Sequence, residues 1–143
     1  MKYETKEAFE EKNMFGIGTA NAAYAQYFIG GSFLNPLTDP TCGLFAANVT
    51  FEPGCRNNWH IHHAEQGGGQ LLFCTAGEGW YQEEGKAAVS LKEGSVIVIP
   101  PNVKHWHGAK ADSRFSHIAM KVPGQGCSNA WCEPVTDEEY SKL

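Results

Sequence analysis

The sequence predicts an all-β fold, built as one barrel or sandwich. From residue 44 to residue 122, short apolar runs alternate with turn residues, as in LFAANVTF, EPG, NNWHIHH, AEQGGG and QLLFCTAG. Strands at this spacing are typical of sandwiches and barrels. No long amphipathic helical pattern separates the runs, which also indicates an all-β architecture. The length of 143 residues suits a single domain.

The expected elements follow a regular order. The first dozen residues are charged and predict either a short helix or a frayed end. Residues 23–37 are rich in aromatics and contain paired glycines, which predicts a bent strand or two short strands before a turn at residues 36–40. The strand pattern then continues through GWYQEEG, KAAVSL, SVIVIPP, KHWHGA and RFSHIAMKV. Thr136 precedes Glu139 by three residues, a capping-box pattern that predicts a short outer helix.

Charge and hydropathy exclude two classes of partner. Sixteen acidic residues outnumber eleven basic ones, for a net charge of −5, and the basic residues form no cluster. Because phosphate binding needs clustered Lys and Arg, nucleic acid is not an expected partner, and a small or uncharged ligand fits better. No run approaches the roughly 18 apolar residues of a membrane span, and the start lacks the apolar run of a signal peptide. We therefore expect a cytoplasmic protein that does not bind membranes.

The cysteines predict reduced thiols. The chain has five, an odd number without CxxC spacing: Cys42, Cys55, Cys74, Cys127 and Cys132. A bridge between Cys127 and Cys132 is the main alternative.

The histidines give the strongest functional signal. All six fall between residues 60 and 117, and five of them form the groups His60-Ile61-His62-His63 and His105-Trp106-His107. Since residues two apart on a strand share a face, His60 projects with His62, and His105 projects with His107. His63 faces the other way, and we expect it to have a structural role or to lie on the surface. Burying unpaired imidazoles costs about 1–3 kcal/mol for each unsatisfied group, and a bound metal removes that cost.

At this point the motifs resemble those of the cupin superfamily. The first cupin motif matches GCRNNWHIH from Gly54, followed by a turn and Gln70-LLFCTA-Gly77, and the second matches Gly94-SVIVI-Pro100-PNVK-His105. The resemblance covers roughly residues 42–122 and implies a double-stranded β-helix, or jelly-roll barrel. We therefore expect residues 1–143 to form one cupin domain, with its core barrel at about 42–122 and short helical or extended segments at the ends.

Two departures from the cupin motifs are informative. The usual glutamate position holds Gln70, and seven residues separate it from His62, where the motif has three or four. Glu65 and Gln66 are rival ligands, since Gln66 has the usual spacing from His62. The glycine of the second motif is replaced by Asn102, which tolerates a left-handed conformation better than most residues.

The resemblance narrows at IPPNVKHWHGA, FSHIAM and EPVTDEEY, which are similar to the small cupins associated with carboxymuconolactone decarboxylases and to manganese-dependent cupin hydroxynitrile lyases. That resemblance implies a ligand set of three His and one Gln, which are His60, His62, Gln70 and His105 here. It also implies acid–base roles for two further histidines, His107 and His117. With ordinary pKa values near 6.5, either could exchange a proton at neutral pH.

Neutral ligands determine the expected chemistry. Three imidazoles and an amide leave a divalent ion its full charge, which favours Lewis-acid chemistry and disfavours oxidation of the metal. We expect a metal-dependent enzyme that acts on a small organic molecule as a lyase, isomerase or decarboxylase-like catalyst. A metal-dependent dioxygenase and a non-catalytic binding cupin are the alternatives. Manganese, iron, cobalt, nickel and zinc all suit the ligands, and a homodimer is expected because cupins of this size often pair.

Overall fold

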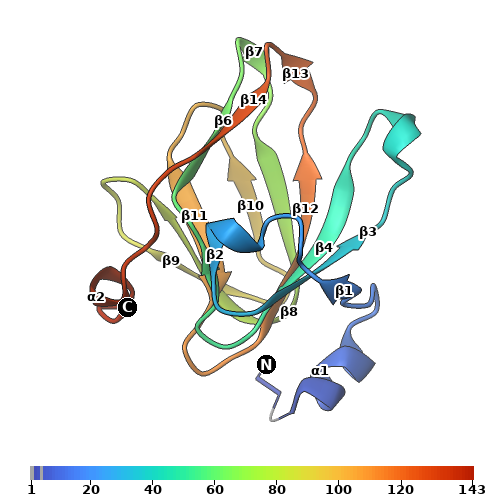
Figure 1. Ribbon diagram of the computed structural model, residues 1–143, viewed down its shortest axis with the longest axis vertical. Helices are drawn as coiled ribbons and strands as arrows, with labels where there is room; N and C mark the ends of the chain where they lie inside the picture. The colour runs from blue at the N-terminus through green and yellow to red at the C-terminus, as the bar shows by residue number, and fades with distance from the viewer. Residues whose placement is uncertain (1, 4) are drawn as a thin grey trace.

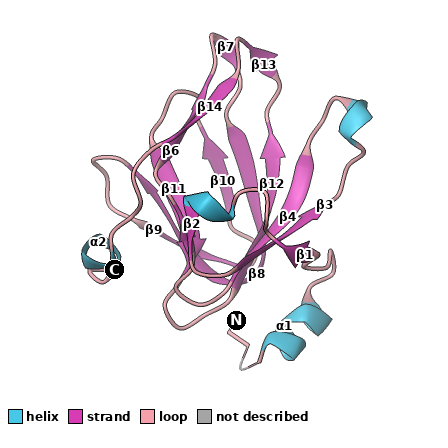
Figure 2. Cartoon of the chain, viewed as in Figure 1, coloured by secondary structure: helices cyan, strands magenta, loops and turns pink. Residues whose placement is uncertain are grey.

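The computed structural model describes residues 2–3 and 5–143 and consists mainly of curled antiparallel sheets (Figures 1 and 2). The prediction of an all-β barrel is confirmed. The helices are α1 (Lys6–Lys12), α2 (Asp137–Tyr140) and the 3-10 turns η1 (Ala25–Tyr27) and η2 (Pro40–Cys42). The strands are β1 (Thr19–Ala20), β2 (Phe28–Ile29), β3 (Ser32–Pro36), β4 (Ala46–Phe51), β5 (Arg56–Asn57), β6 (His60–His63), β7 (Gln66–Gly67), β8 (Gln70–Glu83), β9 (Val89–Lys92), β10 (Val96–Ile99), β11 (His105–Ala109), β12 (Phe115–Lys121), β13 (Gly124–Gln125) and β14 (Ser128–Trp131).

Strand β8 joins the two walls of the barrel. Its first half pairs with β10 and β12 in one sheet, and its second half pairs with β9 and β11 in the other. The chain changes sheet near Gly77, where φ is +73° and an added Cβ would lie 1.8 Å from the carbonyl oxygen of Arg114. Glycine is therefore required at this bend. The sequence suggested two strands here, QLLFCTAG and GWYQEEG, but they form one bent strand.

Apolar side chains fill the space between the two walls. Phe51, Leu72, Leu91, Ile99 and Phe115 are all at most 1% exposed and belong to one cluster. A separate outer cluster contains Trp59, Trp106 and Val135. Neither tryptophan lines the cavity that contains the histidines.

The ends of the chain form short elements around the barrel. The first residues include helix α1, one of the two expected forms, capped by the Thr5 side chain. At the other end, Thr136 and Glu139 form the predicted capping box of α2. Strand β14 was not predicted, and it pairs with β6 beside the histidines.

Asn102 adopts the left-handed conformation expected for the second motif, with φ +66°. Its side-chain amide donates to the carbonyl oxygen of Ala64, and its side-chain oxygen accepts from the Ala64 N–H, both at 3.0 Å. These bonds fix the start of the lengthened loop that follows His62.

The cysteines are free thiols, including Cys127 and Cys132. Within the described part of the chain, no helix has the length and apolar character needed to cross a membrane.

Candidate metal centre

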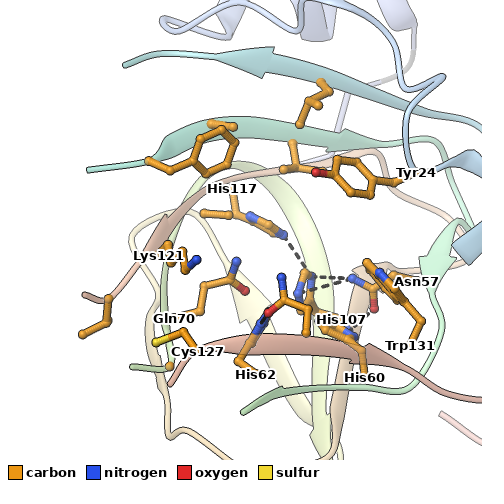
Figure 3. A pocket seen from close by; sticks show the side chains of 18 of the residues that line it. Tyr24, Asn57, His60, His62, Gln70, His107, His117, Lys121, Cys127 and Trp131 are labelled. Carbon is orange, nitrogen blue, oxygen red and sulfur yellow. Dashed lines mark hydrogen bonds between the residues drawn. The ribbon is translucent and has the colours of Figure 1, made fainter. Parts of the chain in front are cut away.

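Three of the predicted ligands converge on one point. His60 and His62 come from the same face of β6, and His105 comes from β11, where it lies directly opposite His60 in the antiparallel pairing. One ligand nitrogen from each ring lies within 4.8 Å of the others. The two-residue period on β6 and the pairing of β6 with β11 therefore produce a three-histidine cluster (Figure 3 shows His60 and His62).

Hydrogen bonds fix the tautomer of each ring. The Nδ1 atoms of His60 and His105 lie 2.9 Å from the carbonyl oxygens of Asn58 and Val103. The Nδ1 atom of His62 lies 2.8 Å from the side-chain oxygen of Asn129. Because these oxygens only accept, each Nδ1 carries the proton, and Nε2 is left with a free lone pair. This is the arrangement that metal-binding histidines use.

Gln70 lies beside this cluster at the start of β8. Among the described residues, its buried Oε1 atom has no hydrogen-bond partner, and neither do the buried Nε2 atoms of His62 and His105. Three unpartnered acceptor atoms around one point are costly unless a cation fills the space between them. The donor set therefore fits a divalent metal. The rival residues Glu65 and Gln66 are exposed, and neither lines the cavity that contains Gln70.

Burial keeps the cluster neutral. Desolvation lowers the pKa of His105 to about 4 and lowers the pKa of His60 well below its ordinary value. Desolvation is also the main cause that lowers the pKa of His62; the side chains of Asn129 and Gln70 oppose this effect, while the charge of Lys121 adds to it. Since metals bind the neutral imidazole, the rings are ready to bind a metal at neutral pH without first losing a proton.

His107 and His117 form a second pair in the same cavity. The Nε2 atom of His117 lies 3.0 Å from Nδ1 of His107, so one ring donates and the other accepts. Asn57 holds His107 in place: its side-chain oxygen accepts the His107 backbone N–H at 3.0 Å, and its Nδ2 lies 3.3 Å from the ring nitrogens. The Nδ1 atom of His117 is buried without a partner. Figure 3 shows the pair linked, with His117 on the far wall from His62.

The expectation of titration near neutral pH does not hold for this pair. Complete burial lowers the pKa of His117 to about 3, and burial together with the neighbouring His117 lowers the pKa of His107 well below 6.5. Both rings are therefore neutral, and each can act as a base but not as a standing acid.

Comparison with known proteins agrees with this geometry. The model of the family described as "Cupin domain" matches residues 47–120, which is half of the chain. The chain is a cupin. Its curated relatives include the (R)-mandelonitrile lyase of Granulicella tundricola, which is 42% identical over 120 residues that make up 82% of this chain and 88% of the relative.

Solved structures support the same assignment. A cupin-like protein of Thermotoga maritima shares 40% identity with a TM-score of 0.77, over 90% of this cupin and 95% of that chain. A predicted oxalate decarboxylase of the same organism shares 16% identity with a TM-score of 0.61, over 73% of this cupin and 91% of that chain. The latter likeness shows the fold alone.

His60, His62, His107 and His117 line a cavity of about 430 Å³. Its remaining wall is largely apolar and includes Phe28, Leu34 and Val49. Trp131 of β14 closes another side, where its ring stacks on that of His60 with centroids 4.7 Å apart. Such a cavity suits a small molecule with an apolar part and few polar groups.

Sequence analysis missed several residues of this cavity. Asn129 and Trp131 belong to the unpredicted β14, so no local pattern identified them. Lys121 could have been found, because it continues the two-residue period of His117 and Ala119 on β12. His63 is exposed as expected but contributes to the rim of the cavity.

Proposed function

We propose that this cupin is a metal-dependent lyase that acts on a small hydroxyl- or carbonyl-bearing molecule. The observation that carries the proposal is the set of unpartnered atoms beside His60, namely Nε2 of His62, Nε2 of His105 and Oε1 of Gln70. We assign these four residues as the ligands of one divalent ion. When bound, such an ion would act as a Lewis acid toward a carbonyl or hydroxyl oxygen.

The acid–base part of the chemistry belongs to His107 and His117. Both rings are neutral, and a neutral imidazole accepts a proton from a substrate hydroxyl when it lies within hydrogen-bond reach. The 3.0 Å contact between the rings would let a proton taken up by one be shared with the other. Asn57 keeps His107 oriented for that exchange.

The name of the curated relative suggests the first substrate to test. That protein is a lyase of (R)-mandelonitrile, a molecule with a hydroxyl on the reacting carbon and an apolar ring. A phenyl group is compatible with the apolar wall formed by Phe28, Leu34 and Val49. The cavity of about 430 Å³ is within the range of small-molecule sites, roughly 300–1,000 Å³.

The test is cleavage of each mandelonitrile enantiomer by protein loaded with manganese, iron, nickel or zinc. The release of benzaldehyde measures the rate of cleavage. We expect turnover that depends on the metal, with manganese first among the candidates. His107→Ala and His117→Ala should keep the metal content while lowering turnover by about 10²-fold or more. Asn35→Ala, which alters a side chain outside the cavity, is the control and should retain both metal content and turnover.

Three outcomes would contradict the proposal. Parent-like turnover in both variants would make His107 and His117 structural residues. Absence of metal from protein prepared with an excess of each ion would remove the metal site. Oxygen uptake by anaerobically iron-loaded protein, without lyase activity, would favour the dioxygenase alternative.

We also propose that residues 1–143 act as one cupin domain and that the protein is a homodimer. Two short outer strands support the second proposal: β9 and β10 each pair only with β8 among the described strands, and Val96 and Val98 of β10 are 54% and 69% exposed. Light scattering of the purified protein would give its mass directly.

A further inference from the structure

Lys121 is the last residue of the inward face of β12. His117, Ala119 and Lys121 alternate along this strand, and all three line the cavity. Lys121 lies opposite Gln70 in the pairing of β12 with β8, and its backbone N–H donates to the carbonyl oxygen of Phe45 at 3.0 Å. Figure 3 shows the Lys121 side chain beside Gln70, on the His117 side of the cavity. The strand therefore carries a lysine to the mouth of the candidate active site.

This lysine has no acidic partner among the residues that the structure describes. Other lysines near the barrel are paired, as Lys104 is with Glu84 and Glu133 and as Lys110 is with Glu78. No carboxylate of the described residues lies within ion-pair distance of Lys121. On a chain of net charge −5, an unpaired lysine at the mouth of a cavity is free to bind an anion.

The charges that line the cavity also favour an anion. No Asp or Glu occurs among the described residues that line it, and Lys121 is its one Lys or Arg side chain. The charge of Lys121 already acts on His62, as one of the causes that lower the pKa of that ring. The four candidate ligands are neutral, so they would leave the charge of a bound ion uncompensated. A negatively charged substrate would supply the opposite charge that the lining of the cavity lacks.

We propose that the substrate is a small monocarboxylate whose carboxylate is held by Lys121 while its apolar part lies against Phe28, Leu34 and Val49. This inference rests on the proposed function in one respect, that the cavity is the substrate site, and it narrows the hydroxyl- or carbonyl-bearing substrate to one that also carries a carboxylate. Mandelonitrile lacks that group, so it serves the activity test as a neutral stand-in for the substrate. A single lysine matches one negative charge. A phosphate dianion is ordinarily held by several donors, such as Arg forks or a row of backbone N–H groups. Lys121 is thereby a specificity-determining residue.

The test compares two ligands of equal shape and different charge. Isothermal titration calorimetry is carried out with mandelate and with neutral mandelamide, on metal-free and on manganese-loaded protein. Inorganic phosphate serves as the probe for an unspecific anion site. The variants are Lys121→Met, which removes the charge, and Lys121→Arg, which keeps it. Lys92→Met, an exposed position on β9 outside the cavity, is the matched control for the loss of one positive charge.

We expect the parent to bind mandelate about fivefold or more tightly than mandelamide, as a partly exposed ion pair allows. Lys121→Met should remove this preference in the metal-free protein, where no ion contributes, while Lys121→Arg and Lys92→Met keep it. Unchanged thermal melting of each variant shows that the fold is intact.

Three results would overturn the inference: a mandelate preference that survives in Lys121→Met, no binding of mandelate by the parent, or tighter binding of phosphate than of mandelate. Failure of the proposed lyase activity would be a separate result, because the charge preference is measured without turnover. Loss of the preference in Lys121→Met together with inactive metal-loaded protein would contradict the proposed function and leave the substrate charge established.

Discussion

His60, His62 and His105 each donate Nδ1–H to an oxygen, which leaves the lone pair of Nε2 free for a metal. Two of these acceptors are backbone carbonyl oxygens two residues earlier on the chain. The third is the side chain of Asn129, which comes from another strand. At the scale of the residue, the candidate centre therefore depends on the three hydrogen-bond acceptors that orient the rings as much as on the rings themselves.

Removal of the Asn129 side chain should weaken the site. Asn129→Ala leaves the Nδ1–H of His62 without its acceptor, and we expect metal affinity to fall by about 10–100-fold. The measurement is competition with a chelator of known affinity. Asn35→Ala is the control, because Asn35 does not line the cavity and its amide donates to the carbonyl oxygens of Phe15 and Gly16. Equal affinities for all three proteins would show that the bond does not orient His62 for a metal.

Measurement of metal content can show whether Gln70, and not Glu65 or Gln66, is the fourth ligand. Gln70→Ala should lose metal, because it removes a buried oxygen that has no other partner. Glu65→Ala and Gln66→Ala alter exposed side chains outside the cavity and should keep it. Gln70→Glu should retain the ion but lower the net charge of the centre, and so change turnover more than metal content. Loss of metal in Glu65→Ala alone would transfer the ligand role to Glu65.

At the scale of the element, one arginine makes several of the contacts that attach the C-terminal segment to the barrel. Arg56 of β5 is 4% exposed, and its guanidinium donates to the carbonyl oxygen of Val135 at 2.8 and 3.1 Å and to the Asp137 carboxylate at 2.6 Å. It also stacks on the ring of Tyr140 at 4.5 Å. Neighbouring Asn57 on the same strand orients His107, so this attachment stabilises the wall behind the site.

Arg56→Met should lower the free energy of unfolding by about 2–3 kcal/mol, since it leaves the buried Val135 carbonyl oxygen without its charged donors. Asp137→Asn should cost less than about 1 kcal/mol, because Asp137 is exposed and a surface ion pair contributes little. Urea denaturation of both variants gives the comparison. Equal losses would mean that the ion pair, and not the buried carbonyl contact, holds the segment.

At the scale of the whole molecule, the buried imidazoles make stability depend on pH. In the unfolded chain a histidine takes up a proton below its ordinary pKa of 6.5, whereas folded His117 does so only at about 3. Between these values the unfolded state binds more protons, so the stability of the metal-free protein falls as pH decreases from 6.5. Above pH 6.5 this group has no effect.

His117 should contribute up to about 1.4 kcal/mol of destabilisation for each pH unit below 6.5. Urea unfolding of the metal-free protein at pH 7 and pH 5 measures the slope. In His117→Gln the slope should be smaller, and in the control His63→Gln, at an exposed position, it should equal that of the parent. A parent slope of zero would show that water reaches the ring despite its burial.

Much of the fold and of the candidate centre was predictable from local patterns. The short strands, the capping box at Thr136 and the left-handed Asn102 each depend on a few neighbouring residues. The shared faces of His60 with His62 and of His105 with His107 follow from the two-residue period of a strand. The choice of Gln70 over Gln66 required the family motif, because both lie downstream of His62 with no local feature to separate them.

Only the tertiary structure decided what surrounds those residues. Strand pairing across distant segments brought β14 beside β6 and supplied Asn129 and Trp131. Burial lowered the histidine pKa values. The sequence showed which face of its strand Lys121 occupies, but only the structure showed that no carboxylate of the described residues pairs with it. Periodicity determines which way a side chain points, while solvent exclusion and the identity of neighbours depend on contacts between residues far apart in the chain.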